Sequence, residues 1–527
     1  MKKQLKAYVN KQLKRKSWLL RHYSERSVLV GLMAIAIGMR FATIAKASIW
    51  HDEGFSMMLS ARNPADIWIG SAHDVHPPLY YEILHFWTSI FGQSEFAARG
   101  LSAVAGLITI FVAYKLVRHI LGRGAATVTL AVLAIAPMAV RYSQEARMYG
   151  ILGLWLVGAT YALILALENR KQAKHWIIYA VLMAAGLYTH YFTVFALAGH
   201  WVYLLVQTRP DQLKIGKTAW LTREWWLANI AIIVLWLPWI PNFIGQFTRG
   251  QGISWIPAVT TSTLPGGIWQ DLTFTDGGQI PSVLFWGVPF LLFLSVCYMV
   301  WQYRKKTPQV ELIFFYAVVP IALTLLASIF KPIYQDRYLV FATYGVYILI
   351  SLAIYQLIRM NRVAGMAALL AFCGILIVGN INVVRQASHT MREVGKFVNE
   401  RYQPGDEIVS AELYTYFDFS YYCKNCLDAR NTQVNQPVAA IYPSPVTTLK
   451  LNTSGGRPNG YGESSLLKDR ADSIYIDSLT TITPVSKRVW IIGKPGQTYW
   501  NTVPVEWKPT LNEIRTNSSE ARMYITP

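Results

Sequence analysis

The sequence predicts a polytopic α-helical membrane protein with about eleven transmembrane helices and a C-terminal α/β or mostly-β soluble domain. Long apolar runs recur through the first three quarters of its 527 residues, and 53% of the chain is hydrophobic. Only 15% of the residues are charged, against roughly 25% in a typical soluble protein. Basic residues gather in alternate connectors between the apolar runs. Disordered, collagenous and small disulfide-rich classes are excluded by this composition.

Each expected span has about the 20 apolar residues that a helix needs to cross a bilayer, or nearly so. The pair around residue 190 could also be one long helix with a break. A bundle of buried soluble helices is the alternative, and the number of apolar runs with basic connectors argues against it. The expected spans are residues 28–48, 97–117, 124–141, 148–167, 175–189, 191–207, 224–241, 283–301, 310–330, 338–357 and 363–383.

The basic residues predict the orientation of the chain. Of the 49 Lys and Arg residues, 24 lie in the N-terminal segment and in alternate connectors, and 9 lie at the opposite ends of the spans or in the first span. Short loops rich in Lys and Arg stay on the cytoplasmic side. We therefore expect a multi-pass protein of the bacterial plasma membrane, with a cytoplasmic N-terminus and an extracytoplasmic C-terminal domain. The net charge of +20 then reflects topology and predicts no nucleic-acid partner.

Three regions follow from this pattern: a basic cytoplasmic segment at 1–27, a membrane domain at 28–384 with a large outer loop at 49–96, and a soluble domain at 385–527. The start of the chain also resembles a signal peptide, but its apolar run is long and carries Arg40, which favours an uncleaved first span. The soluble domain is predicted from turn-forming stretches and short β-type runs.

The cysteines predict little chemistry. Cys297 and Cys373 lie inside expected spans and are read as packing residues. Cys423 and Cys426 form a single CxxC on the outer side, without the second pair that a zinc site needs. A short-loop disulfide is preferred there over a redox or metal role.

The first outer loop carries the strongest functional signal. Asp52 and Glu53 follow the first span directly, and residues 73–81 read His-Asp-Val-His-Pro-Pro-Leu-Tyr-Tyr. Carboxylates beside a membrane cost free energy unless they are paired, hydrated or used. Solvated loop charge is the alternative, but two acidic clusters with three histidines favour a site.

Further polar clusters face the same outer side. They are residues 141–149, 189–191 and 331–338, which mix acidic, basic and aromatic side chains. A carboxylate can act as a general base toward a hydroxyl, and arginines can stabilise a departing phosphate. No glycine-rich nucleotide-binding loop is present in the sequence, so a membrane-borne phosphate donor fits better than a cytosolic nucleotide.

Over residues 28–384 the chain resembles membrane glycosyltransferases of the GT-C fold. The group is family 39, which holds bacterial aminoarabinose transferases and protein O-mannosyltransferases. The resemblance rests on Asp52-Glu53 after the first span, on residues 73–81, on Gln-Glu-Ala-Arg-Met-Tyr at 144–149 and on Arg337-Tyr338. It implies transfer of a sugar from a polyprenyl-phosphate donor to a hydroxyl acceptor, with inversion at the anomeric carbon. The acceptor could be a glycolipid, a cell-envelope glycan or a protein.

The resemblance also implies roles for individual residues. Asp52 would be the general base, with Glu53 beside it and Asp74 as a second acid that orients the acceptor or helps to bind a cation. Arg147 and Arg337 would hold the donor phosphate with support from Lys331. The remaining substrate-binding candidates are His73, His76, Tyr81, Glu145, His190 and Tyr334.

Several of these assignments have structural alternatives. Arg147 could be an ion-pair residue at a helix start, His76 could cap the loop before two prolines, and His190 could be a buried, satisfied polar group. No cofactor is required by the pattern. A divalent cation held by Asp74, His76 and Glu145 is left open, because no spacing fixes a metal.

Two other classes of protein compete with the glycosyltransferase interpretation. A polytopic transporter or lipid flippase would show helix-repeat symmetry or ionisable residues near mid-span. A membrane scaffold without catalysis would not need the acidic clusters of the first loop. The clustering of acids, histidines and arginines in outer loops favours the enzyme.

Overall fold

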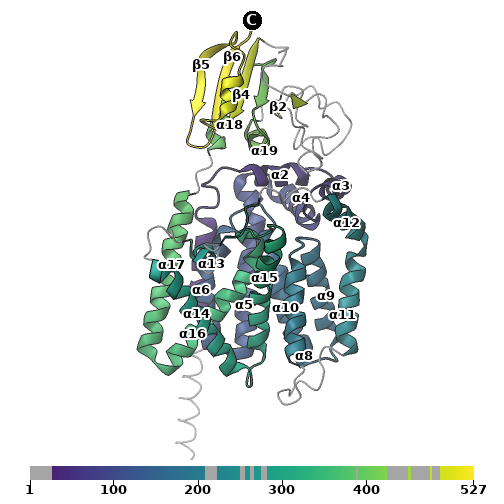
Figure 1. Cartoon of the computed structure of the whole chain (residues 1–527), viewed down its shortest axis with the longest axis vertical. Helices are drawn as coiled ribbons and strands as arrows, with labels where there is room; N and C mark the ends of the chain where they lie inside the picture. Colours follow the sequence, from purple (N-terminus) through teal and green to yellow (C-terminus); the bar gives the residue numbers. More distant parts are fainter. Residues whose placement is uncertain are drawn as a thin grey trace, which may run out of the picture.

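The computed structural model shows a helical bundle with a small sheet domain above one end (Figure 1). It describes nine parts of the chain, to which every structural statement below is confined. They are residues 26–207, 222–249, 256–260, 266–274, 282–386, 390–423, 449–452, 475–476 and 487–527.

Seven helices are long and apolar enough to cross a membrane among the described residues, by length and composition. The residues at 26–41 are also helical, and three apolar helices are shorter. The seven candidates are α5 (Glu95–Leu121), α8 (Tyr149–Glu168), α11 (Arg223–Trp236) with η2 (Leu237–Trp239) and α12 (Ile240–Arg249), α14 (Ser282–Tyr303), α15 (Gln309–Phe330), α16 (Val340–Met360) with η5 (Asp336–Leu339), and α17 (Arg362–Gln386). The shorter ones are α6 (Arg123–Ala134), α9 (Ala173–Leu187) and α10 (Thr193–Val206).

Each expected span overlaps one of these helices, and two differ in detail. The range 124–141 is divided, because α6 ends before Pro137 and the short α7 (Pro137–Arg141) begins there. Proline lacks the N–H that would continue a helix and is well suited to a first turn. The pair around residue 190 is two helices, α9 and α10, rather than one.

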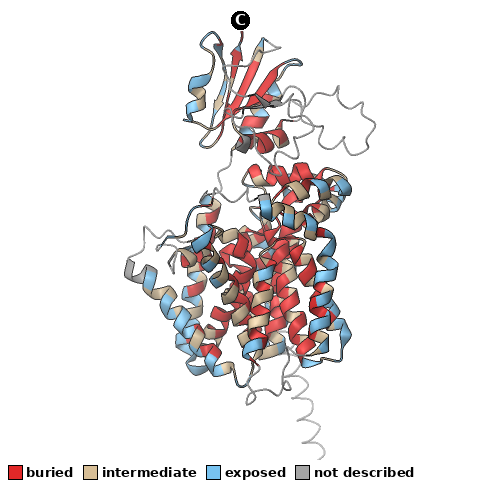
Figure 2. Cartoon of the chain, turned by 45° about the vertical axis from the view of Figure 1, so that its right-hand side comes forward, coloured by how far each residue is buried: buried red, intermediate tan, exposed pale blue. Residues whose placement is uncertain are grey.

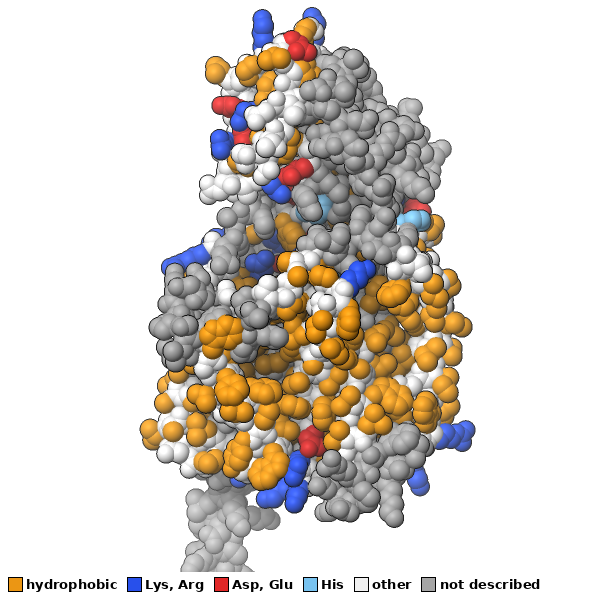
Figure 3. All heavy atoms as spheres, in the orientation of Figure 1, with side chains coloured by type: hydrophobic (Ala, Val, Ile, Leu, Met, Phe, Trp, Pro, Cys, Tyr) orange, Lys and Arg blue, Asp and Glu red, His pale blue; other side chains and the backbone are white. Residues whose placement is uncertain are grey.

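The bundle has a buried interior and an apolar exterior. Figure 2 shows the buried residues concentrated in the middle of the bundle. On the face that Figure 3 shows, hydrophobic side chains cover the helices, and Lys and Arg lie at the lower edge and near the upper end. Outward-facing residues such as Phe330 (86% exposed) and Val363 (81%) would be costly in water. This surface suits lipid, so the fold is that of a membrane protein.

The expected outer loop at 49–96 is mostly helical. It forms α2 (His51–Ser60), α3 (Pro64–His73) and α4 (Leu79–Phe91), which lie over the upper end of the bundle (Figure 1). Asn63 caps α3 by accepting from the Asp66 N–H at 3.0 Å, and Pro64 occupies its first turn. The polar residues of the loop are therefore held on rigid elements.

The C-terminal part is an α/β domain with a six-stranded sheet of order β3-β2-β1-β4-β6-β5. Strands β1 to β4 run parallel and β6 is antiparallel to both β4 and β5. The register places Ile408 opposite Trp490, both fully buried. Its elements are α18 (Met391–Arg401), β1 (Glu407–Ser410), α19 (Leu413–Tyr422), β2 (Leu449–Asn452), β3 (Tyr475–Ile476), β4 (Arg488–Gly493), η9 (Thr498–Thr502), β5 (Lys508–Arg515) and β6 (Glu520–Ile525).

The cysteines agree with the sequence analysis where they are described. Cys297 and Cys373 are free and lie in α14 and α17. Cys423 is disulfide-bonded, and Cys426, its expected partner, lies outside the described residues.

Helices α10 and α15 pack closely at Gly199. A Cβ on Gly199 would lie 2.7 Å from the backbone oxygen of Phe315, so Gly199→Ala should destabilise the bundle by about 1–3 kcal/mol. Thermal unfolding in detergent measures the effect. The matched control is Gly374→Ala in α17, where a Cβ meets nothing within 4 Å. Equal unfolding temperatures for the two variants would contradict the close helix contact.

Candidate active site

The site begins where the chain leaves the first helix and enters α2. Residues 48–50 belong to no helix or strand, and α2 starts at His51 with Trp50, in an extended conformation, as its N-cap. The Trp50 N–H donates to Glu53 Oε2 at 3.4 Å, which satisfies one of the N–H groups that a helix start leaves open. This local geometry directs Asp52 and Glu53, although adjacent, into different surroundings.

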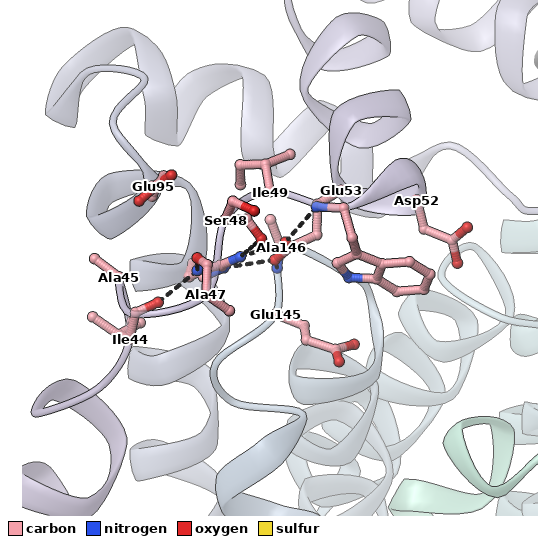
Figure 4. A network of polar contacts seen from close by, with 12 residues as sticks. Ile44, Ala45, Ala47, Ser48, Ile49, Asp52, Glu53, Glu95, Glu145 and Ala146 are labelled. Carbon is pink, nitrogen blue, oxygen red and sulfur yellow. Dashed lines mark hydrogen bonds and ion pairs between the residues drawn. The ribbon is translucent and has the colours of Figure 1, made fainter. Parts of the chain in front are cut away.

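Glu53 is fully buried in an ion pair with Arg99 of α5. Arg99 Nε donates to Glu53 Oε1 at 2.7 Å and Nη2 donates to Oε2 at 2.6 Å, while the Ala146 N–H also reaches Oε1 at 2.7 Å. Arg99 further donates to the carbonyls of Ile44, Ala47 and Ser48 (Figure 4). The carboxylate of Glu53 thus links α2 to α5 and to the loop that contains Ala146, and both of its oxygens accept hydrogen bonds.

The side chain of Asp52 points away from this network, as Figure 4 shows. It is 21% exposed, and Oδ2 lies 3.4 Å from Arg337 Nη1 and 3.9 Å from Arg147 Nη2. Burial raises the pKa of Asp52. The positive charges of Arg147 and Arg337, with smaller effects of His51 and His76, lower it by more, so that the pKa lies below its usual value. Asp52 is therefore ionised at neutral pH and partly open to a ligand.

Arg147 and Arg337 come from different parts of the bundle. Arg147 precedes α8 and is buried, and its Nη1 donates to the Asp52 carbonyl at 3.2 Å and to Ser56 Oγ at 3.1 Å, with Tyr81 OH at 3.5 Å. Arg337 lies in η5, with its guanidinium 5.7 Å from the Trp50 ring centre. The two cations and the carboxylate form a compact cluster that could bind an anion beside Asp52.

A second group surrounds His190. Asp74 Oδ2 lies 3.2 Å from His76 Nδ1, and the rings of His76 and His190 are 5.6 Å apart. His190 Nδ1 accepts from the Phe192 N–H at 3.2 Å. Burial, with His76 and Arg147, lowers the pKa of His190 well below its usual value. A neutral ring whose Nδ1 accepts carries its proton on Nε2, so His190 presents a hydrogen-bond donor.

Glu145 is held beside the first helix by its own loop. Gln144 Nε2 donates at 3.0 Å to the carbonyls of Met39 and Arg40, near the end of that helix. Glu145 Oε1 accepts from Arg141 Nε at 2.9 Å, while Oε2 is buried and has no hydrogen-bond partner within the described part of the chain. Burial raises the pKa of Glu145, and Arg141 opposes this effect. Glu145 borders a small cavity that Trp50, Glu53 and Arg99 also line.

Three predicted residues lie apart from this cluster. The His73 ring is bonded through Nδ1 to the Ile69 carbonyl at 2.9 Å within its own helix. Lys331 is exposed at the end of α15. Tyr334 donates to Asp271 Oδ2 at 2.6 Å and lines a separate cavity with Asp271. The structure thus brings together Asp52, Asp74, His76, Tyr81, Arg147, His190 and Arg337, with Glu53 and Glu145 at the edge of the cluster.

The metal candidates do not converge within the described part of the chain. Asp74 and His76 form a pair, and Glu145 is bonded to Arg141. No three His, Cys, Asp or Glu side chains of the described residues gather closely enough to hold a metal ion.

Sequence reasoning missed Arg99, which it counted only among the basic residues of the outer side. The structure makes Arg99 the partner of Glu53. A signal was present, because a lone arginine in the first turns of an apolar helix needs an acidic or carbonyl partner. Which partner it takes depends on tertiary packing.

Solved structures of ArnT and of an archaeal oligosaccharyltransferase share this fold. ArnT from Cupriavidus metallidurans in the apo state aligns with a TM-score of 0.66 at 14% identity, covering 95% of this chain and 98% of that one. ArnT bound to undecaprenyl phosphate aligns with a TM-score of 0.63 at 15% identity, covering 94% and 97%. The archaeal oligosaccharyltransferase AglB from Archaeoglobus fulgidus, in complex with an inhibitory peptide and a dolichol-phosphate, gives a TM-score of 0.51 at 13% identity, covering 90% and 70%. The chain therefore has the GT-C fold.

A family model also matches part of the sequence. Residues 75–241 match the family model described as dolichyl-phosphate-mannose-protein mannosyltransferase. No curated protein sequence matches the chain. The family match and the fold both resemble those of GT-C membrane glycosyltransferases, the group that the motifs at 52–53, 73–81 and 144–149 predicted.

Loss of the Glu53 charge should destabilise the folded protein. Glu53→Gln leaves Arg99 buried without a counter-charge, which should cost about 3–5 kcal/mol. Thermal unfolding of the purified protein measures the loss. The control Glu393→Gln removes an exposed carboxylate from α18 and should leave the unfolding temperature unchanged. A Glu53→Gln protein as stable as wild type would refute the structural role of this pair.

Proposed function

We propose that the protein transfers a sugar from a polyprenyl-phosphate-linked donor to a hydroxyl acceptor, with inversion, and that Asp52 is the general base. The observation that carries this proposal is the position of Asp52 within 3.4 Å of Arg337 and 3.9 Å of Arg147. One carboxylate and two fixed cations are the groups that the reaction requires. ArnT has been solved with undecaprenyl phosphate and AglB with a dolichol-phosphate, which supports a lipid-phosphate donor.

The proposed step balances as a single displacement. The acceptor oxygen forms a bond to the anomeric carbon while the bond from that carbon to the phosphate oxygen breaks. The electron pair leaves with the lipid phosphate, and the acceptor proton moves to Asp52. Attack from the face opposite the leaving group inverts the anomeric centre.

The two arginines would stabilise the leaving phosphate. Their guanidinium groups are fixed by Ser56, Tyr81 and the Trp50 ring before a substrate arrives. Preorganised cations stabilise developing charge without reorganising during the reaction. When the donor phosphate binds, it would share the arginines with Asp52, which frees the carboxylate to accept a proton.

Neighbouring polar residues would position the sugar and the acceptor. Asp74 and His76 form one paired group, and the neutral His190 presents an Nε2 proton to a hydroxyl or ring oxygen. Glu145 lies on the Glu53 side of this cluster and has one buried oxygen without a hydrogen-bond partner among the described residues. These groups suit a hydroxyl-rich ligand. The proposed acceptor is a hydroxyl group of a glycolipid, a cell-envelope glycan or a protein.

The proposal places the reaction outside the cytoplasm. The charge pattern predicts a cytoplasmic N-terminus and an extracytoplasmic face that carries α2, α3, α4 and the C-terminal domain. The division into 1–27, 28–384 and 385–527 remains our proposal for the domains. The site clusters at the sheet-domain end of the bundle, which matches this orientation.

Substitution of the base tests the proposal directly. Asp52→Asn should lower kcat at least about 100-fold because the general base is lost, while unfolding temperature and donor binding are retained. Transfer of radiolabelled sugar from defined polyprenyl-phosphate donors measures the activity. Full activity of Asp52→Asn would exclude it as base. Wild-type protein that consumes no donor but moves lipid across vesicles would favour the flippase alternative.

Substitution of an arginine tests the phosphate site. Arg337→Gln should weaken binding of undecaprenyl phosphate about 10- to 100-fold, since a hydrogen bond to a charged group contributes about 1.5–3 kcal/mol. Titration of the purified protein measures this binding. The control is Arg359→Gln, an exposed arginine at the other end of α16. Unchanged affinity in Arg337→Gln would remove Arg337 from the donor site.

A further inference from the structure

We propose that the C-terminal domain is a positioning element of the active site, in which Arg392, Phe417 and Tyr422 hold the segment that carries Asp52. The chemical consequence rests on the proposed function, and the structural part stands on contacts between the two domains. Figure 1 shows α19 directly above α2, and both views place the sheet domain over the outer helices.

Arg392 of α18 binds the chain just before α2. Its Nε donates to Glu95 Oε1 at 2.8 Å, and its Nη2 donates to the carbonyls of Ala45 at 2.9 Å and Ala47 at 3.1 Å. The Ala47 carbonyl also accepts from Arg99 Nη1 at 2.8 Å. One backbone segment is therefore held by an arginine from the membrane domain and another from the C-terminal domain.

Tyr422 at the end of α19 adds a second anchor. Its hydroxyl accepts from the Ile49 N–H at 2.6 Å and donates to Glu95. Tyr421 beside it donates to the Gln93 carbonyl at 2.5 Å. Glu95 thus binds both Arg392 and Tyr422, which joins α18, α19 and the first turn of α5.

Gly54 permits the closest approach between the domains. A Cβ on Gly54 would lie 2.7 Å from the backbone carbon of Phe417, 2.8 Å from its oxygen and 2.9 Å from the Asp418 nitrogen. Those atoms belong to the backbone of α19 and cannot move aside as a flexible side chain would. Only glycine allows this contact, and it lies two residues after Asp52.

The ring of Phe417 extends the contact toward the reacting groups. Its centre is 5.4 Å from the His51 ring and 5.7 Å from the Phe55 ring, and Phe55 in turn lies 5.9 Å from Tyr81. Tyr81 contacts Arg147. Phe417 therefore packs against both residues that flank the Asp52-Glu53-Gly54 turn of α2.

A shift of α2 would change the electrostatic surroundings of Asp52. The charged and titratable groups that act on its carboxylate are Arg147, Arg337, His51 and His76. Asp418 of α19 acts in turn on His51. Because the arginines oppose the effect of burial, moving α2 away from them should raise the pKa of Asp52.

Gly54→Ala tests the inference, with Gly38→Ala as the matched control, since a Cβ on Gly38 meets nothing within 4 Å. We expect Gly54→Ala to lower kcat about 10- to 100-fold, because a displacement of about 1 Å can cost that much. We also expect the acid limb of its pH–rate profile to move to higher pH, with KM for the donor nearly unchanged. A general loss of fold would not move the acid limb. A profile and kcat equal to those of Gly38→Ala would overturn the proposal.

Arg392 supplies a second variant in case Gly54→Ala does not fold. Arg392→Gln should lower kcat and speed amide hydrogen exchange at residues 45–60, while Arg392→Lys should partly restore both. Lys396→Gln, an exposed change on the same helix, is the control. If the wild type transfers no sugar, the proposed function fails but exchange at 45–60 still decides this inference. Unchanged exchange in Arg392→Gln would overturn it.

Discussion

The buried ion pair between Glu53 and Arg99 is the constraint on which the rest of the site depends. Burying two charges is costly unless their hydrogen-bonding groups are also satisfied. Here the five N–H groups of the Arg99 side chain are used by Glu53 and by the carbonyls of Ile44, Ala47 and Ser48. The same pair fixes the Ala146 N–H. The end of the first helix, α5 and the loop before α8 are therefore joined at one point.

This constraint explains how two adjacent carboxylates come to differ in character. Successive residues of a helix point about 100° apart, so fixing Glu53 inward directs Asp52 toward Arg147 and Arg337. Glu53 gives rigidity, while the Asp52 side chain stays partly exposed. As the proposed base, Asp52 would benefit from this rigid support, because its geometry need not be established when the substrate binds.

The sequence predicts the bundle well because the length and hydropathy of a span are local properties. The motifs also contain residues that the structure brings together, namely Asp52, Asp74, His76, Arg147 and Arg337, and their roles stay predictions. The sequence could not separate these residues from His73 and Lys331, which have the same chemical types in the same loops. His73 faces its own helix backbone, and Lys331 lies at an exposed helix end. That difference arises from helix register and packing, which residue spacing alone does not encode.

The junction between the domains also depends on side chains that bind backbone carbonyl groups. A membrane helix that ends at the interface leaves carbonyl groups without intrahelical partners, and the chain at 44–48 must then turn sharply into α2. Gln144 binds two of the earlier carbonyls, Arg99 binds three later ones, and Arg392 adds contacts from outside the bundle. Without Arg392 and α19, one side of this turn would face water, where its conformation has more freedom. We therefore expect the position of the Asp52 carboxylate to depend on contacts from both domains.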